Sequence, residues 1–460
     1  MHRRIRCPFT PEHDQTKGAA VRKRTENAGP RRRPVQRRFT EREPSERCKK
    51  LALAYIRDMG THRRELCRAL LVIGIASGSG CHATPPSVDG SAPFGSAPGA
   101  ARPASGYVTV DSSRVYYEEC GAANTGPTIV LLHDGLLHSV TWDDVWPAMC
   151  ATHRVLRYDR RGMGRSDPPK QPFIPTEDLT ALLAARGISS VTLVGSSSGS
   201  GLAIDYAFRH PDRVDRLVLI GPVVHGMPSS EHFLARGAAN NAPLANGDVR
   251  AAARNWANDR YQIASGHTAA REKLFRALVE YPRDLTYQGN LELRFAVPAA
   301  ARMSEIRAPT LILVGAEDIP DVQAYAGAVE LGVWGAKREV VEGVGHLIQL
   351  EAPAFVTERV DDFIAQTPIV TVDTQRLRNF AGRYDSLMYG RAGEFLVNSG
   401  RLVVRVPTER DLPLFPSSDS TFYALAWGGI RFTFHHDSTA HVTSVDVTDA
   451  GGTHRATPAA

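Results

Sequence analysis

One serine in this sequence has neighbours that could make it a nucleophile. Residues 195–199 read Gly-Ser-Ser-Ser-Gly, which places Ser197 at the centre of a Gly-x-Ser-x-Gly pattern. The apolar, β-branched run 191–194 precedes the pattern, and apolar residues at helical spacing follow it from Leu202. A strand, a sharp turn and a helix in this order would strain Ser197 and project its hydroxyl from a sheet. The N–H of Ser198 could then stabilise an oxyanion. A Ser/Gly-rich loop without chemistry is the alternative.

A nucleophilic serine needs a general base, and the base needs an acid to orient it. His346 lies in the glycine-rich stretch 342–347, directly after apolar residues typical of a strand. Asp318 follows the buried-strand run 310–314, at the strand end where open α/β sheets bind ligands. Glu317 and Asp321 are rival acids. The order Ser, Asp, His is one of the known triad orders.

A second loop could complete an oxyanion hole. The strand-like run 128–132 is followed by His-Asp-Gly-Leu at 133–136. Glycine lets such a loop fold back, so that the backbone N–H of Gly135 or Leu136 would face the nucleophile. His133 is expected to hold the loop and not to catalyse. The charged turn 159–166, which follows the run 155–158, indicates no chemistry of its own.

These five motifs in this order resemble the α/β-hydrolase superfamily, in its epoxide-hydrolase-like and haloperoxidase-like branch. The resemblance covers residues 107–366. It implies an α/β fold with a mostly parallel eight-stranded sheet, a helical cap at about 222–302, and a Ser197–His346–Asp318 triad. The implied enzyme is a carboxylesterase-like serine hydrolase that cleaves an ester, or an amide, of a small-molecule substrate through an acyl-enzyme. Relatives with aspartate at the elbow cleave epoxides or C–halogen bonds, and Ser197 argues against both.

Several positions depart from the family pattern. Ser196 stands where His or Gln is usual, Ser200 where a second glycine is usual, and Asp134 replaces the glycine after the loop histidine. A catalytically silent binding or scaffold protein on the same fold is therefore a second hypothesis. A third keeps the triad but performs cofactor-free perhydrolysis or C–C bond cleavage. The large apolar residues of the cap are candidates for an acyl pocket, although most are expected to be cap core: Phe233, Leu234, Trp256, Tyr261 and Phe275.

The charge distribution argues against a nucleic-acid partner. The chain has 460 residues and a formal net charge of +6. Residues 1–70 hold 20 of the 55 Lys and Arg and 8 of the 49 Asp and Glu, so this segment carries +12 and the rest of the chain carries −6. A nucleic-acid-binding body needs positive charge on its folded surface.

The basic N-terminal region is expected to serve export. Residues 1–58 are predicted to be a disordered basic leader or an upstream extension ahead of a start at Met59. Segment 59–81 has an arginine pair, a short apolar stretch and small residues before Cys81, as a bacterial signal peptide with a lipoprotein box has. Cys81 would then carry a lipid that anchors the protein to a membrane of the cell envelope. Residues 82–105 are predicted to be a flexible linker, and residues 106–368 the hydrolase domain.

Residues 372–460 are predicted to form a small antiparallel β-domain. The runs 394–397 and 401–406 flank a Gly-containing turn and indicate a hairpin, and further short runs follow. The stretch 380–384 resembles the lipocalin-like β-domain found behind serine β-lactamase-like hydrolases. His435, His436 and His441 could suggest a metal site, but strand alternation places neighbours on opposite faces. No cofactor and no metal are expected, and the oligomeric state and any pairing of Cys120 with Cys150 stay open.

Overall fold

The computed structural model describes residues 104–287, 289–368, 370, 372–388, 390–398, 400–409, 411–427 and 429–459. These residues belong to one compact unit, Gly95–Ala460. The predicted leader, the signal segment with Cys81 and most of the predicted linker lie outside the described residues. Within the described ranges, no helix has the length and apolar character that a membrane span needs.

An eight-stranded sheet forms the centre of the first part of the chain. Its order is β1-β2-β4-β3-β5-β6-β7-β8, with β1, β2 and β4 paired antiparallel and every other pair parallel. The predicted mostly parallel eight-stranded sheet is confirmed. The strands are β1 (Ala104–Val110), β2 (Ser113–Cys120), β3 (Ile129–Leu132), β4 (Val155–Tyr158), β5 (Val191–Ser196), β6 (Val214–Ile220), β7 (Thr310–Gly315) and β8 (Lys337–Val341). Strand β1 begins at Ala104, so the last two residues of the predicted linker pair with β2.

Alternating side chains of the strands pack into two separate hydrophobic cores, one on each face of the sheet. In β3, Val130 and Leu132 belong to one buried cluster, while Ile129 and Leu131 belong to another on the opposite face. Both faces are covered, which explains why the central parallel strands are mostly apolar, whereas the edge strand β8 begins with three charged residues. The first cluster includes residues of α3 (Pro175–Ala185), α4 (Ser198–Arg209) and α9 (Pro320–Gly332), and the second includes residues of α2 (Trp146–Thr152) and α11 (Pro353–Gln366).

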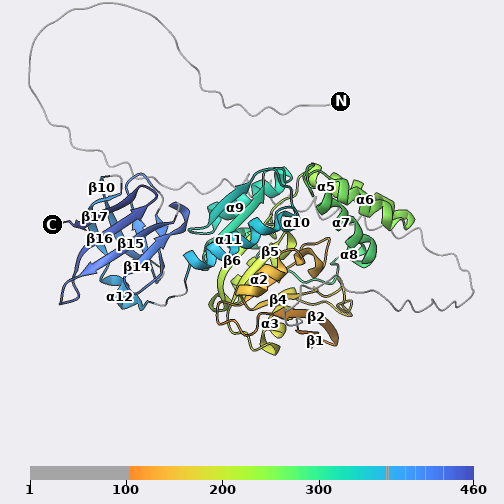
Figure 1. Cartoon of the computed structure of the whole chain (residues 1–460), viewed down its shortest axis with the longest axis horizontal. Coiled ribbons are helices and arrows are strands. Elements are labelled where there is room, and N and C mark those ends of the chain that lie inside the picture. The colour runs from red at the N-terminus through yellow and green to blue at the C-terminus, as the bar shows by residue number, and fades with distance from the viewer. Residues whose placement is uncertain are drawn as a thin grey trace, which may run out of the picture. The chain divides into compact units, whose positions relative to one another are not determined.

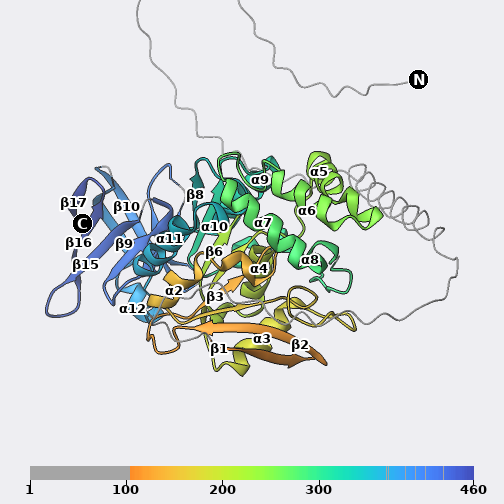
Figure 2. The ribbon, with the colours of Figure 1, turned by 45° about the vertical axis from the view of Figure 1, so that its right-hand side comes forward.

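A group of helices lies between β6 and β7 in the sequence, where the cap is predicted. These helices are α5 (Glu231–Asn241), α6 (Val249–Asn258), α7 (Thr268–Glu280) and α8 (Pro282–Thr286), and Figure 2 shows them gathered together in green. Helix α6 buries Ala252, Ala253, Trp256 and Ala257, whereas α5 buries none of its residues. Leu234 of α5 is 61% exposed. This exposure argues against the predicted role of Leu234 in lining an acyl pocket.

The C-terminal residues form a nine-stranded antiparallel sheet, drawn in blue in Figure 1. Its end strands, β12 and β13, are separated in the chain by Leu414 alone, so the sheet nearly closes on itself. This confirms the predicted barrel-like β-domain. After α12 (Thr374–Arg378) come β9 (Gly382–Met388), β10 (Arg391–Asn398), β11 (Arg401–Arg405), β12 (Leu412–Pro413), β13 (Phe415–Pro416), β14 (Thr421–Ala424), β15 (Ile430–His436), β16 (Val442–Asp449) and β17 (Gly452–Pro458).

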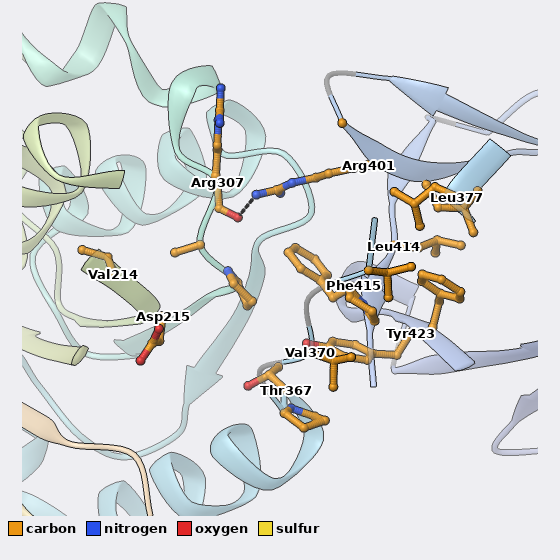
Figure 3. A pocket seen from close by; sticks show the side chains of 18 of the residues that line it. Val214, Asp215, Arg307, Thr367, Val370, Leu377, Arg401, Leu414, Phe415 and Tyr423 are labelled. Carbon is orange, nitrogen blue, oxygen red and sulfur yellow. Dashed lines mark hydrogen bonds between the residues drawn. The ribbon is translucent and has the colours of Figure 1, made fainter. Parts of the chain in front are cut away.

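The β-domain contacts the part of the same compact unit that contains the eight-stranded sheet. Phe415 and Tyr423 belong to the buried cluster that also contains residues of β7 and α11, and the Arg401 guanidinium donates to the carbonyl of Arg307. A cavity of about 340 Å³ lies at this contact, and Figure 3 shows its lining, which contains none of the predicted site residues. Burial and the positive charge of Arg307 lower the pKa of Arg401 to about 10.

Cys120 and Cys150 form a disulfide that the sequence left open. Cys120 ends β2 and Cys150 lies in α2, and their Cα atoms are 5.5 Å apart. A disulfide across 30 residues constrains the unfolded chain and typically adds about 2–4 kcal/mol to the free energy of unfolding.

Candidate active site

Ser197 lies at a strained turn between β5 and α4. Its backbone has φ 53° and ψ −117°, a conformation that costs a non-glycine residue about 1–3 kcal/mol. The turn is possible because its flanking glycines allow close backbone approach. A Cβ on Gly199 would lie 2.2 Å from the carbonyl oxygen of Leu132, and one on Gly195 would lie 2.6 Å from the carbonyl group of Gly199. The structure therefore has the strand, turn and helix expected around a nucleophilic serine.

His346 and Asp318 form the second part of the predicted constellation. Nδ1 of His346 donates to Oδ2 of Asp318 across 2.8 Å, and both side chains are buried. Burial acts to lower the pKa of His346, but the charge of Asp318 and its hydrogen bond outweigh it and raise that pKa above its usual range. The two alternative acids make no hydrogen bond to His346 in the described part of the chain. Glu317 is exposed, and Asp321 accepts hydrogen bonds from the N–H and hydroxyl of Ser230 in the cap.

Ser197 and His346 each contact the segment formed by Ile220 and Gly221. The N–H of Ser197 donates to the carbonyl of Ile220 across 2.8 Å. At the next residue, a Cβ on Gly221 would lie 3.0 Å from Nδ1 of the His346 ring. The ring thus packs against the segment that pairs with the nucleophile turn, whereas the Ser197 hydroxyl has no hydrogen bond to His346 in the described chain. Nucleophile–base bonds commonly tighten only when substrate binds.

The predicted oxyanion donors differ in availability. The N–H groups of Leu136 and Leu137 both donate to Oδ1 of Asp134, at 2.7 and 2.9 Å. The N–H of Leu136 is therefore not available to an oxyanion, because it already donates a hydrogen bond to the Asp134 carboxylate, which stands where a glycine is usual. Gly135 remains the better donor of this loop, and a Cβ on it would lie 3.3 Å from Oγ of Ser198. Ser198 is the first residue of α4, where backbone N–H groups have no partner inside the helix.

The unusual serines of the elbow make ordered hydrogen bonds. Ser196 Oγ accepts from Nε2 of Gln349 at 3.1 Å, and the same amide donates to Thr141 at 2.9 Å. Ser200 Oγ donates to the carbonyl of Gly195 at 2.7 Å. Both departures from the family pattern are satisfied within the elbow, so they leave its shape intact.

The cap holds the loop that carries His346. The N–H of His346 donates to the carbonyl of Tyr261 at 2.9 Å. Glu351 accepts from Ala264 of the cap region at 2.8 Å and from Gly345 at 2.9 Å, so one carboxylate joins the cap to the histidine loop. Burial raises the pKa of Glu351 to about 7. The position of His346 is thus set from both the sheet and the cap.

The charged turn 159–166 is more closely tied to the site than its sequence indicates. Asp159 is buried, and although burial acts to raise its pKa, Arg165 outweighs it and brings that pKa down to about 2. Arg161 forms a buried ion pair with Asp178 of α3. Arg160 instead reaches the nucleophile turn, where Nη2 donates to Oγ of Ser198 at 2.9 Å. The sequence offered no signal for this contact beyond the glycine-punctuated charge of the turn.

Some candidate residues are not brought to the triad. Trp256 packs in a cap cluster that also contains Leu137 and Leu347, and its Nε1 donates to Asn241 at 2.8 Å. His435 in the β-domain is bonded to Asp446 at 2.7 Å. In the described residues, no group of three or more His, Cys, Asp or Glu side chains could hold a metal ion.

The fold is that of the α/β hydrolases, and the comparisons agree. Residues 127–353 match the family model described as the alpha/beta hydrolase fold, and this part of the chain has that fold. The chain is 28% identical over 270 residues to the 2-hydroxymuconate semialdehyde hydrolase of Pseudomonas sp. (strain CF600), covering 54% of this chain and 91% of that protein.

Two further similarities cover the same part of the chain. The 2-hydroxy-6-oxo-6-phenylhexa-2,4-dienoate hydrolase of Comamonas testosteroni is 22% identical over 275 residues, which are 55% of this chain and 91% of that protein. The crystal structure of the enol-lactonase from Burkholderia xenovorans LB400 has a TM-score of 0.49 and 24% identity, and the match covers 56% of this chain and 100% of that one.

Proposed function

We propose that this protein is a serine hydrolase that cleaves a carboxylic ester through an acyl-enzyme intermediate, with an amide as the less favoured substrate. The observation that carries the proposal is the buried 2.8 Å bond from His346 to Asp318, on a ring packed against the backbone partner of Ser197. The neutral imidazole takes the Ser197 proton as the hydroxyl attacks the acyl carbon. Asp318 holds the tautomer in which Nε2 is free to accept, and stabilises the imidazolium that forms.

The same residues carry the second half of the reaction. The protonated His346 returns its proton to the leaving alcohol, and then removes a proton from the water that attacks the acyl-enzyme. During both attacks, negative charge develops on the former carbonyl oxygen. The N–H groups of Gly135 and Ser198 stabilise that charge, which typically lowers the barrier by about 3–4 kcal/mol for each donor.

Carbon–carbon bond cleavage by the same triad is the second candidate. Two similar proteins are named as hydrolases of 2-hydroxymuconate semialdehyde and of a 2-hydroxy-6-oxo-dienoate. The named dienoate contains no ester or amide bond, so its hydrolysis breaks a C–C bond next to a ketone. The catalytically silent alternative loses its motivation, because Ser196 and Ser200 are accommodated by hydrogen bonds inside the elbow.

A labelling experiment followed by a substrate panel tests these candidates. We expect a fluorophosphonate probe to modify Ser197 in the folded protein, as peptide mapping by mass spectrometry would show. We then expect p-nitrophenyl esters of increasing acyl length to be hydrolysed at least about 100-fold faster, in kcat/KM, than a 2-hydroxy-6-oxo-dienoate followed by its ultraviolet absorbance. The reverse ranking would favour C–C cleavage, and an unlabelled, inactive protein would favour the binding or scaffold hypothesis.

We also propose that the protein is exported and lipid-anchored at Cys81. The Cys120–Cys150 disulfide supports export, because disulfides persist mainly in oxidising compartments. Intact-mass analysis of the protein from a bacterial membrane fraction should show a chain beginning at Cys81 with added lipid mass. Cys81→Ser should remain in the precursor form, whereas Cys67→Ser should be processed as usual. A membrane-free mature chain that retains Met1 is the result that contradicts the proposal.

A further inference from the structure

The oxyanion loop is held by a side chain that the triad does not use. Arg160 directly follows Asp159 after β4, and it is half-buried beside the nucleophile turn. Its Nη2 donates to the carbonyl of Asp134 at 2.8 Å and to Oγ of Ser198 at 2.9 Å. One guanidinium nitrogen therefore bridges the two loops that supply the candidate oxyanion donors.

The bond to Asp134 fixes the direction of the Gly135 amide. The carbonyl of Asp134 and the N–H of Gly135 belong to one planar trans peptide, in which they point in opposite directions. A second donor, Nδ1 of His133, lies 2.8 Å from the same carbonyl oxygen. With two donors on its carbonyl, this peptide keeps its N–H on the opposite side.

His133 and Arg160 support each other in this arrangement. Nε2 of His133 accepts the backbone N–H of Arg160 at 2.8 Å, which leaves Nδ1 as the protonated nitrogen that donates to Asp134. Burial, and then the charge of Arg160, lower the pKa of His133 well below its usual range. The ring thus stays neutral and keeps this tautomer, and the loop, the turn and the guanidinium form one closed hydrogen-bonded ring.

The hydrogen bond from Arg160 to Ser198 concerns the second donor of the candidate oxyanion hole. The Ser198 side chain is held toward Arg160, and its own backbone N–H is the donor at the start of α4. Within the described residues Arg160 forms no ion pair with a carboxylate, unlike Arg161 and Arg165 of the same turn. Its positive charge is therefore not taken up by an ion pair, and it would favour negative charge on a substrate carbonyl oxygen bound beside these two loops.

We propose that Arg160 is a positioning residue that holds both halves of the oxyanion hole, the Gly135 and Ser198 amides, and this rests on the proposed serine-hydrolase function. The effect operates in the transition state, when the oxyanion exists. Arg160→Met is expected to lower kcat for p-nitrophenyl acetate by about 100-fold with little change in KM, since losing one oxyanion donor costs about 10²–10³-fold. Arg160→Lys, which keeps the positive charge but lacks the rigid planar fork of the guanidinium, should recover part of that loss.

The loop can be observed independently of activity. The sequence contains two Asp-Gly pairs, Asp89-Gly90 and Asp134-Gly135. Protein labelled with carbonyl-¹³C aspartate and ¹⁵N glycine therefore gives one cross-peak for each pair in a carbonyl–amide correlation spectrum. Arg160→Met should shift or broaden the Gly135 cross-peak and leave the Gly90 cross-peak unchanged. Arg302→Met is the matched control, because Arg302 pairs with Glu305 on the surface and should alter neither the peak nor kcat.

The outcomes separate this proposal from the function on which it rests. If the wild-type protein hydrolyses the ester while Arg160→Met keeps both its kcat and its Gly135 cross-peak, Arg160 has no positioning role and the serine-hydrolase function stands. If the wild-type protein neither hydrolyses the ester nor reacts with the phosphonate, the proposed function is refuted. The Gly135 cross-peak then still decides whether Arg160 holds the loop.

Discussion

Replacing Ser197 with alanine should reduce kcat for a p-nitrophenyl ester by about 10³- to 10⁶-fold, and should abolish reaction with a fluorophosphonate. Without the hydroxyl no acyl-enzyme can form, and only binding and the oxyanion donors remain to assist direct attack by water. Losses of nucleophile and base are not additive, so Ser197→Ala combined with His346→Ala should be about as inactive as either single variant. Steady-state kinetics over a range of enzyme concentrations measures this residual rate.

Two further variants show whether such a loss is chemical or structural. Ser189→Ala changes an exposed serine after α3 and should keep the wild-type kcat. Ser197→Gly should be as inactive as Ser197→Ala but unfold at a higher temperature, because glycine adopts φ 53° without the strain of about 1 kcal/mol or more that a side chain incurs. A Ser197→Ala protein that is folded and retains more than about a tenth of the activity would contradict the assignment of the nucleophile.

The parts of the site that were predictable from sequence are those encoded locally. A β-branched run, glycines that permit close approach and a following helical pattern are contiguous, so the elbow at Ser197 could be recognised as a unit. Asp318 and His346 were recognisable because parallel strands bring their carboxyl ends to one edge of the sheet. The choice of Asp318 over Asp321 could not be made this way, since both follow the same strand and only the fold shows which carboxylate meets the imidazole.

The parts that were missed depend on contacts between distant segments. Asp134 was noticed as a departure, but its capture of the Leu136 N–H depends on how the loop folds. Arg160 is 38 residues from Ser198 and lies in a turn with three arginines, so nothing in the sequence singles it out. In the β-domain, β17 buries Ala456 alone and contains Gly452 and Pro458, so it lacks the alternation that revealed the neighbouring strands.

Asp318→Asn should lower kcat on the order of 10⁴-fold and move the acid limb of the pH–rate profile to lower pH. An asparagine at this position favours the wrong imidazole tautomer, which accounts for the size of the loss. In the wild-type protein Asp318 raises the pKa of His346 against the effect of burial. Because the base must be neutral, wild-type kcat/KM should fall as the pH drops through that raised pKa. Without the carboxylate, burial and the charge of Arg236 lower the pKa of His346 and only Asp134 opposes them, so the limb should shift downward.

Asp321→Asn provides the matched control, because it makes the same chemical change three residues further along. Asp321 accepts hydrogen bonds from Ser230 at the start of α5, so its loss should lower thermal stability slightly and leave the pH limb in place. Profiles of kcat/KM from pH 5 to 9 for both variants separate the two effects. A 10⁴-fold loss in Asp321→Asn, with Asp318→Asn near wild type, would reverse the assignment of the acid. Equal, small losses in both would mean that His346 needs no carboxylate partner in order to act as the base.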